Sequence, residues 1–270
     1  MSLVEVIVSM GLTIALSATI LSLVAAGQAI ARTQPESSDL QQRARIALQV
    51  LGRELRDAGA GPDRGVMPGP LIRHFPPVVP SADGGITIWK TTSRDAQGTP
   101  ALATGLGVTT VALQDSASCL AGQAACAFTA GTSALAFTTD GCRTAFRIAT
   151  VAANALTLDA PLAGCELPLG AAVAEGEVRT YRVDPVARQL VRRDEATGSS
   201  APMLDGVASM TAAYFADAAG TDPVSGVTDG DLMRVRRVRL TLRLIASNPL
   251  LHVPDLVVAV DVAPRNFEDR

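Results

Sequence analysis

The stretch Met1-Ser-Leu-Val-Glu-Val-Ile-Val-Ser-Met10 decides the fold, because one carboxylate, that of Glu5, stands in an otherwise apolar opening. From Val6 to Ala31 the chain has no charged residue and no histidine. This run is longer than the roughly 20 residues with which a helix crosses the hydrocarbon core of a bilayer. A carboxylate beside such a segment is costly unless it is paired. The pattern predicts a membrane-spanning helix over residues 1–31 and a specific partner for Glu5.

Two simpler interpretations of residues 1–31 fit less well. A cleavable signal peptide has a basic start, a short apolar core and a cleavage site of small residues. No lysine or arginine precedes Arg32, and the apolar run is too long for such a core. A plain membrane anchor fits the length, but it gives Glu5 no function beyond reaching the lipid headgroups from the helix end.

The order Met1-Ser2-Leu3-Val4-Glu5 resembles the start of the mature chain in type IV pilins and pseudopilins, and the resemblance extends to about residue 57. In that family a prepilin peptidase cuts before residue 1 and methylates the new N-terminus. The resemblance implies that Met1 is this methylated residue, with its leader already removed, although Phe is more usual there. It also implies that Glu5 pairs with the N-terminal amine of a neighbouring subunit. Opposite charges attract strongly in a helix bundle of low dielectric, where each charge alone is costly.

A second, amphipathic part of the same helix is predicted over residues 32–57. Gly59-Ala-Gly61-Pro62 then ends the helix. Pro35 is expected to kink this helix or to break it in two. If the helix is continuous, residues 2–57 extend over roughly 84 Å at about 1.5 Å per residue. The apolar positions follow the i, i+3, i+4 spacing of a helix that covers a core; they are Leu40, Ala44, Ala47, Leu48, Leu51 and Leu55.

The remainder of the chain is predicted to be rich in strands. Residues 58–85 are expected to form an irregular connection, because Pro76, Pro77 and Pro80 exclude regular strand pairing there. Residues 86–270 are expected to form a β-rich globular domain. The expected fold class is therefore α+β, the type IV pilin fold, with a long N-terminal helix packed on an antiparallel sheet. Short apolar runs predict strands over residues 86–89, 108–113, 134–137, 145–151, 155–158, 177–183, 189–192, 207–215, 235–246 and 256–262.

Four cysteines, Cys119, Cys126, Cys142 and Cys165, indicate two disulfides if the chain is exported to an oxidising compartment. We favour the pairs Cys119–Cys126 and Cys142–Cys165, because each closes a short local loop. Free buried thiols are the alternative. A zinc site does not fit, since the chain has no Cys-x-x-Cys motif and neither histidine lies near these cysteines in the sequence.

Motifs of catalysis and of cofactor binding are missing from the sequence. The two histidines lie far apart, and there is no nucleophile elbow, zinc-protease motif, phosphate-binding loop or complete dinucleotide-binding motif. We therefore expect no enzymatic activity, no cofactor and no bound metal. One segment, Ala216 to Asp231, gathers acidic residues in a loop rich in Gly and Pro. A solvated loop is the expectation, and a calcium site is the alternative; its aspartates are Asp217, Asp222, Asp229 and Asp231.

Nucleic acid is not an expected partner of the chain as a whole. The net charge is −3 and aromatic residues make up only 3% of the sequence, so neither a basic surface nor stacking platforms are indicated. Arginines at 237, 239 and 243 alternate with apolar residues, which predicts a half-solvated strand. A charged subunit interface and a DNA contact at a pilus tip are the alternatives for these arginines.

The second half of the chain resembles minor pilins of the PilW type. The similar segments are Ala44 to Gly61, Tyr181 to Arg193, Leu204 to Tyr214 and Val262 to Asn266. The resemblance implies a minor pilin that acts with other minor pilins and the major pilin to prime a type IV pilus near its tip. It implies the prepilin peptidase and the assembly platform as further partners. It places the chain in the inner membrane, with the β-domain in the periplasm, and later in the extracellular pilus.

Two other functions stay open. Type II secretion minor pseudopilins of the GspJ type have the same layout but are usually shorter. A membrane-anchored protein whose β-domain binds a ligand would share the apolar helix without the assembly function.

Overall fold

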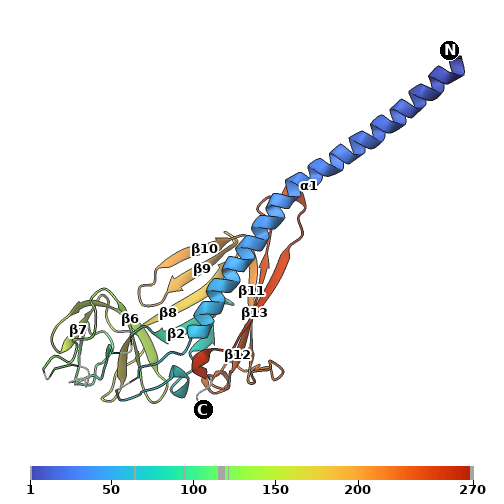
Figure 1. Ribbon diagram of the computed structural model, residues 1–270. Coiled ribbons are helices and arrows are strands. Elements are labelled where there is room, and N and C mark those ends of the chain that lie inside the picture. The colour runs from blue at the N-terminus through green and yellow to red at the C-terminus, as the bar shows by residue number, and fades with distance from the viewer. Residues whose placement is uncertain (1, 64, 94, 115–118, 121, 268–270) are drawn as a thin grey trace.

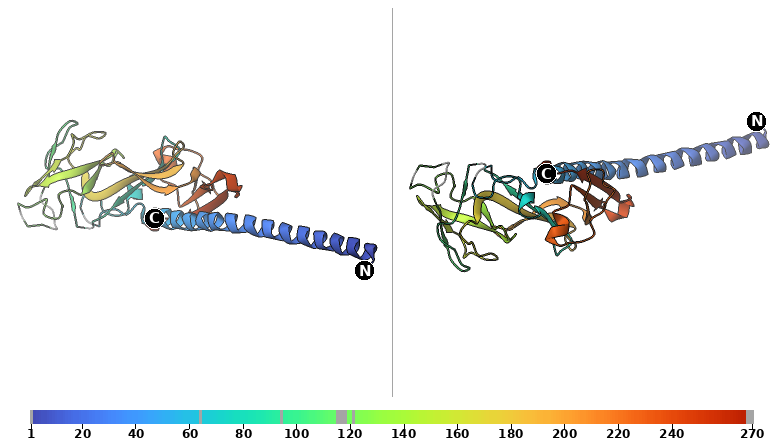
Figure 2. Two further views of the ribbon diagram at one scale, coloured as in Figure 1. Left: turned by 90° about the horizontal axis from the view of Figure 1, so that it is seen from above. Right: turned by 90° about the horizontal axis from the view of Figure 1, so that it is seen from below.

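The computed structural model describes residues 2–63, 65–93, 95–114, 119–120 and 122–267, and for residues 5 and 29 it describes the backbone only. The molecule consists of one long helix followed by antiparallel strands, which confirms the α+β layout (Figure 1). The N-terminal part of the helix projects away from the strands in every view (Figure 2).

The long helix α1 (Leu3–Asp57) is uninterrupted, and its 55 residues extend over roughly 82 Å at about 1.5 Å per residue. Of the two outcomes predicted for Pro35, the break is therefore wrong, and the kink stays a prediction. A proline inside a helix removes one backbone donor, and helical turns continue for more than twenty residues on either side of this one. The helix ends where the glycines predict it, and the left-handed φ of +76° at Gly59 turns the chain away from the helix axis.

Strands of the first sheet follow the order β1-β2-β8-β5-β6-β7-β4, with β9 and β3 also paired to β8, and β10 paired to β9. A second sheet has the order β11-β12-β13. The strands of the first sheet are β1 (Val78–Pro80), β2 (Ile86–Thr91), β3 (Gln97–Gly98), β4 (Thr110–Ala112), β5 (Ser133–Phe137), β6 (Arg143–Val151), β7 (Ala155–Leu158), β8 (Ala172–Asp184), β9 (Gln189–Asp194) and β10 (Ser200–Asp205). The second sheet contains β11 (Val207–Phe215), β12 (Arg237–Leu244) and β13 (Leu256–Val262). Short helical turns are η1 (Leu71–Arg73), α2 (Asp229–Leu232), η2 (Pro249–Leu251) and η3 (Arg265–Phe267).

The 13-residue strand β8 joins two lobes of the first sheet. Its second half pairs with β2 and β9 near the helix, and its first half pairs with β5 in an outer lobe. Gly176 lies where these pairings meet. A Cβ atom there would come within 2.2 Å of a Leu135 methyl group and 2.7 Å of the Lys90 carbonyl oxygen, so only glycine fits.

The C-terminal half of α1 supplies the helical part of the main core. Its apolar stripe packs with inward side chains of β2, β8 and the second sheet. At Gly52 a Cβ atom would lie 3.5 Å from a Val260 methyl group, which places β13 close against the helix. The predicted stripe is confirmed at Leu40, Ala44, Ala47, Leu51 and Leu55, which are 0–4% exposed, while Leu48 is half-buried.

Two cores of the outer lobe lie away from the helix. One contains Val111, Phe146 and Ile148, and the other contains Phe75, Trp89 and Phe137 at the junction of the lobes. Both predicted disulfides, Cys119–Cys126 and Cys142–Cys165, are formed in this lobe with Cα atoms 5.9 Å apart. The second disulfide brackets the β6–β7 hairpin, as the sequence predicts.

The connection between α1 and β2 is more regular than the prolines indicate. Strand β1 pairs with β2, with Val79 opposite Thr87 and Pro80 opposite Ile86. The expectation that Pro80 excludes pairing is wrong, because an edge strand tolerates a proline whose missing N–H would point away from the sheet. All ten predicted strands are present. Those predicted over residues 155–158, 207–215 and 256–262 have the predicted ends, and the others have shifted ends, while β3 and β10 were not predicted.

Candidate functional site

The N-terminal half of α1 presents apolar side chains on every side, and no described residue of the β-domain covers it. Leu3, Ile14 and Leu23 are 79%, 67% and 72% exposed. Within the described residues, α1 is the one helix long and apolar enough to cross a membrane, and none of its most apolar window is buried. A helix that is hydrophobic all round requires an apolar environment, which this chain does not itself supply.

Hydroxyl side chains in this half of α1 do not make it polar. The hydroxyl of Ser9 donates to the Val6 carbonyl at 2.9 Å, and that of Thr13 donates to the Ser9 carbonyl at 2.8 Å. Thr19 donates to the Leu16 carbonyl at 2.7 Å in the same way. Because each hydroxyl is satisfied inside the helix, the outer surface presents few groups that need water.

The predicted assembly site consists of Met1 and Glu5, and the structure describes neither side chain. Met1 lies outside the described residues. Glu5 lies in the first turns of α1, but its side chain is outside the description. Methylation at Met1 and subunit pairing by Glu5 therefore stay predictions.

A polar cluster fixes α1 to the β-domain at the level where the helix leaves it. The Arg43 guanidinium lies 2.8 Å from the Asp39 carboxylate and donates to the Asp205 carbonyl at 3.1 Å. The Glu36 carboxylate accepts from the backbone N–H of Ser247. Gly206, with φ +70°, leaves the room that Arg43 needs, since a Cβ atom there would meet the guanidinium at 2.2 Å.

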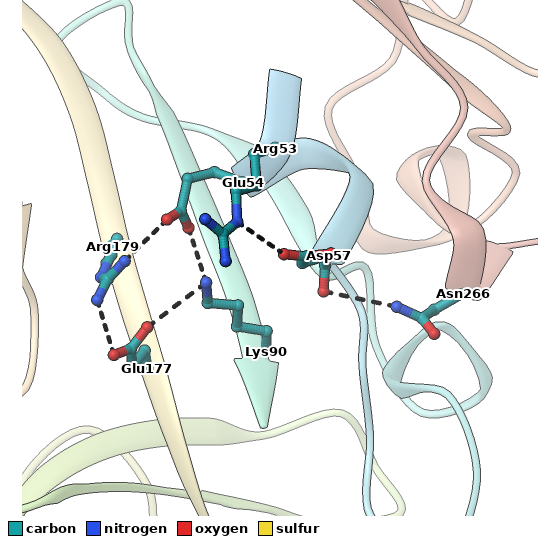
Figure 3. A network of polar contacts seen from close by, with 7 residues as sticks. All are labelled: Arg53, Glu54, Asp57, Lys90, Glu177, Arg179 and Asn266. Atoms are coloured by element: carbon teal, nitrogen blue, oxygen red, sulfur yellow. Dashed lines mark hydrogen bonds and ion pairs between the residues drawn. The ribbon is translucent and has the colours of Figure 1, made fainter. Parts of the chain in front are cut away.

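A second polar cluster fixes the other end of α1, and Figure 3 shows it in close view. The Lys90 ammonium lies 2.9 Å from the Glu54 carboxylate and 3.5 Å from that of Glu177. The Arg179 guanidinium lies 2.9 Å from Glu54 and 2.7 Å from Glu177. Two carboxylates and two cations from α1, β2 and β8 thus form a closed network whose side chains are only 14–27% exposed.

The surroundings of this Glu54 network change the acidity of two neighbours. Burial acts to lower the pKa of Arg179, but the Glu54 and Glu177 carboxylates outweigh it and raise that pKa. Burial, and after it the charge of Glu54, raises the pKa of Tyr181. Arg179 and Tyr181 therefore both keep their proton at physiological pH.

The C-terminal end of α1 has a cap from the far end of the chain. The Asn266 amide donates to the Ala58 carbonyl at 3.0 Å and lies 3.5 Å from the Asp57 carbonyl (Figure 3). The Asp57 carbonyl also accepts from the Ala60 N–H at 3.4 Å, so the amide serves chiefly the Ala58 carbonyl, just beyond the last helical residue. The last described residues thus close the structure onto α1.

The four aspartates of Ala216 to Asp231 are not gathered into a cation site. Asp217 accepts hydrogen bonds from the backbone N–H groups of Thr221 and Asp222 at 2.9 Å each. Asp229 pairs with Arg143 at 2.7 Å, and Asp231 accepts from the Thr228 hydroxyl at 2.6 Å. The described residues contain no group of three or more metal-ligating side chains.

Strand β12 alternates as the sequence predicts. Its arginines are paired along the outer face of the second sheet: Arg239 lies 2.8 Å and Arg237 3.3 Å from Asp261, and Arg243 donates to Asp255 at 2.7 Å. A strand whose cations are neutralised by its neighbour offers few charges to phosphate, which favours the half-solvated strand over the DNA contact. The opposite face is fully buried at Val238, Leu240, Leu242 and Leu244.

Comparisons with known proteins give no relative: no family model, no curated protein and no solved structure matches this chain. The apolar half of α1 was found from the sequence, whereas the clusters around Arg43 and Glu54 were missed. Glu54, Lys90 and Arg179 stand far apart in the chain, so no local spacing could have brought them together. The isolated occurrence of the only lysine, Lys90, was the one signal available.

Proposed function

We propose that this chain is a minor pilin that takes part in priming and assembly of a type IV pilus, at or near its tip. The observation that carries the proposal is the contrast within α1. One half is bound to the β-domain through a buried stripe and a polar cluster at each end. The other half is apolar on every side and has no partner among the described residues. Lipid solvates that half before assembly, and neighbouring helices solvate it in the filament.

Glu5 is the group that links the two environments. An unpaired carboxylate within a membrane helix costs about 2.5 kcal/mol or more. Pairing with the N-terminal amine of a neighbouring subunit removes that cost and fixes the longitudinal register of the two helices. The β-domain then selects the neighbouring minor pilins, and the pilin-type start of the chain supports this assignment.

Substitution of Glu5 tests the proposal. Glu5→Gln keeps the shape of the side chain and removes its charge, so incorporation into filaments should fall by roughly sixtyfold, the factor that corresponds to about 2.5 kcal/mol. Incorporation is measured as the amount of this chain in the sheared filament fraction, relative to the amount in the membrane fraction. Ser9→Ala is the matched control, since it removes a hydroxyl that is satisfied inside the same helix.

If the chain were a membrane-anchored binding protein, the opposite result would be expected for Glu5→Gln. An anchor with no assembly function would tolerate Glu5→Gln with unchanged activity of its β-domain. Equal filament incorporation by Glu5→Gln and Ser9→Ala would therefore overturn the minor-pilin proposal. A type II secretion pseudopilin would respond to Glu5→Gln through lost protein secretion rather than lost piliation, which separates the two assembly functions.

A further inference from the structure

The loop between β12 and β13, residues 245–255, lies beside α1 where the helix leaves the β-domain (Figure 1). Its Ser247 N–H donates to the Glu36 carboxylate. An open cavity of about 580 Å³ separates the loop from the helix, lined by Thr33 and Ser37 on one side and by Val253 on the other. The loop is thus attached to the part of α1 that directly follows the apolar half.

The tip of this loop presents an apolar side chain to the outside. Leu250 is 79% exposed, although the turn that carries it is well defined. The Asn248 side chain accepts from the Leu250 N–H at 3.0 Å, and Pro249 opens the short helix η2. His252 ends the turn with φ +51°, a left-handed conformation that is unfavourable for a residue with a Cβ atom. A defined turn that holds a leucine in water indicates a partner for that leucine.

The position of the loop along α1 identifies what this partner is. If residues up to Ala31 span the hydrocarbon core, Thr33 lies roughly 3 Å and Glu36 roughly 7.5 Å beyond its edge, at about 1.5 Å per residue. The headgroup layer on one side of a bilayer is about 5 to 7 Å thick. The loop is hydrogen-bonded to α1 at Glu36 and faces Thr33 across the cavity, so it lies beside the part of the helix that we place at the level of the headgroups. Arg32, the first charge after the apolar half, lies at the same level and is exposed.

We propose that loop 245–255 is a second membrane contact, in which Leu250 enters the boundary between headgroups and acyl chains of the leaflet from which α1 emerges. This inference rests on the proposed membrane span of α1. Burial of a leucine side chain favours the apolar side, and Arg32 reaches the phosphates beside it. Helix and loop together restrict how the β-domain tilts on the membrane, so that its partner-binding faces keep one orientation before assembly.

The test uses the full chain in vesicles of phosphatidylcholine and phosphatidylglycerol. Its cysteines are all in disulfides within the described residues, so a thiol introduced by Leu250→Cys is the one that takes a nitrobenzoxadiazole fluorophore. Leu102→Cys is the matched control, since Leu102 is 70% exposed and lies in the outer lobe. Leu16→Cys reports on the span itself. Each probe is quenched separately by a lipid-borne nitroxide and by aqueous iodide.

We expect the Leu250 probe to be quenched by the lipid-borne nitroxide. Its iodide quenching should be roughly tenfold weaker than that of the Leu102 probe, because the apolar fluorophore takes the place of the leucine at the same boundary. Equal iodide quenching at both positions, with Leu16 still quenched from the lipid, would place the loop in water and overturn the inference while the span stands.

Two other outcomes also decide the matter. If neither quencher reaches the Leu250 probe, protein covers it, and the covering surface belongs to a neighbouring subunit. This outcome also overturns the proposed lipid contact. A Leu16 probe open to iodide would contradict the membrane span and hence the proposed function.

Discussion

The two halves of α1 share one continuous backbone and differ in where their partner lies. Residues 32–57 bury one stripe against the β-domain and turn a polar face outward, so their partner is inside the chain. Residues 6–28 have no charged side chain, and their apolar side chains are exposed in every direction. A stripe of apolar residues defines the direction of its partner, whereas an apolar surface all round specifies only an environment. The difference separates the part of the helix that stabilises the β-domain from the part for which we propose a function in assembly.

The largest effect should come from the same substitution made in each half. Leu51 is fully buried and Leu16 is 63% exposed. Leu51→Ala should lower the free energy of unfolding of the β-domain by about 2 to 5 kcal/mol, because it leaves a cavity under the helix. Leu16→Ala should change it by less than about 0.5 kcal/mol. Chemical denaturation of the full chain in detergent, followed by fluorescence of the single tryptophan, Trp89, measures both.

Equal losses in this pair of variants would contradict the comparison. They would mean that residues 3–31 contribute to the stability of the β-domain, and that the two halves fold as one unit. Trp89 is a suitable reporter because it is 9% exposed and packs edge-on to Phe75, with ring centroids 5.5 Å apart.

The Glu54 network should give the next largest effect. Glu54→Gln leaves Lys90 and Arg179 without one of their two carboxylates, and we expect a loss on the order of 2 kcal/mol, since water reaches the partly exposed pairs. Adding Lys90→Met should cost less than the sum of the single variants, because the two residues are coupled. The measurement is a double-mutant cycle of unfolding free energies.

Arg53→Gln is the control for this cycle. Arg53 is on the same helical turn, but its side chain is 81% exposed and its nearest carboxylate, that of Asp57, is 4.0 Å away. An exposed pair of this kind contributes less than about 0.5 kcal/mol. If Glu54→Gln were as mild as Arg53→Gln, the network would not be what holds this end of α1.

The sequence predicted the elements whose signal is local. The stripe from Leu40 to Leu55, the end of the helix at Gly59 and the β6–β7 hairpin with its disulfide all follow from spacing between near neighbours. Strand β10 was missed because Ser200-Ala-Pro-Met has no alternation of apolar and polar residues, and it lies on an edge where none is needed. The predicted break at Pro35 gave too much weight to a single lost hydrogen bond.

The polar clusters could not be predicted from the sequence. Arg43 reaches a carbonyl of β10, and Asn266 reaches the end of α1, each across most of the chain. Such contacts depend on how the sheets meet the helix, and a single sequence does not contain that information. The position of the loop that carries Leu250 could not be predicted either. It lies beside Thr33 only once β12 and β13 are paired.

Acid should lower the stability of the β-domain through Asp217, in the loop that precedes β12. Hydrogen bonds from Thr221, and then from the N–H of Asp222, lower the pKa of Asp217 from 3.8 to about 2. A lowered pKa in the folded state adds stability that is present above the unfolded value and is lost as the pH falls through the folded value. Between pH values of about 5 and 2, the unfolding midpoints of the parent chain and of Asp217→Asn should therefore converge. If the two midpoints kept a constant difference over this pH range, the hydrogen bonds of Asp217 would not contribute to the stability of the β-domain.

The smallest effect should come from a hydroxyl in the apolar half. Thr19 donates to a carbonyl of its own helix, so Thr19→Val should leave membrane insertion, filament incorporation and domain stability unchanged within about 0.5 kcal/mol. The same change at Thr180 should cost about 1 kcal/mol, because the Thr87 hydroxyl, 2.8 Å away, loses its partner. Filament incorporation and unfolding of both variants are measured side by side. A defect of Thr19→Val as deep as that of Glu5→Gln would mean that this hydroxyl bonds to a neighbouring helix, and the apolar half would then specify a direction after all.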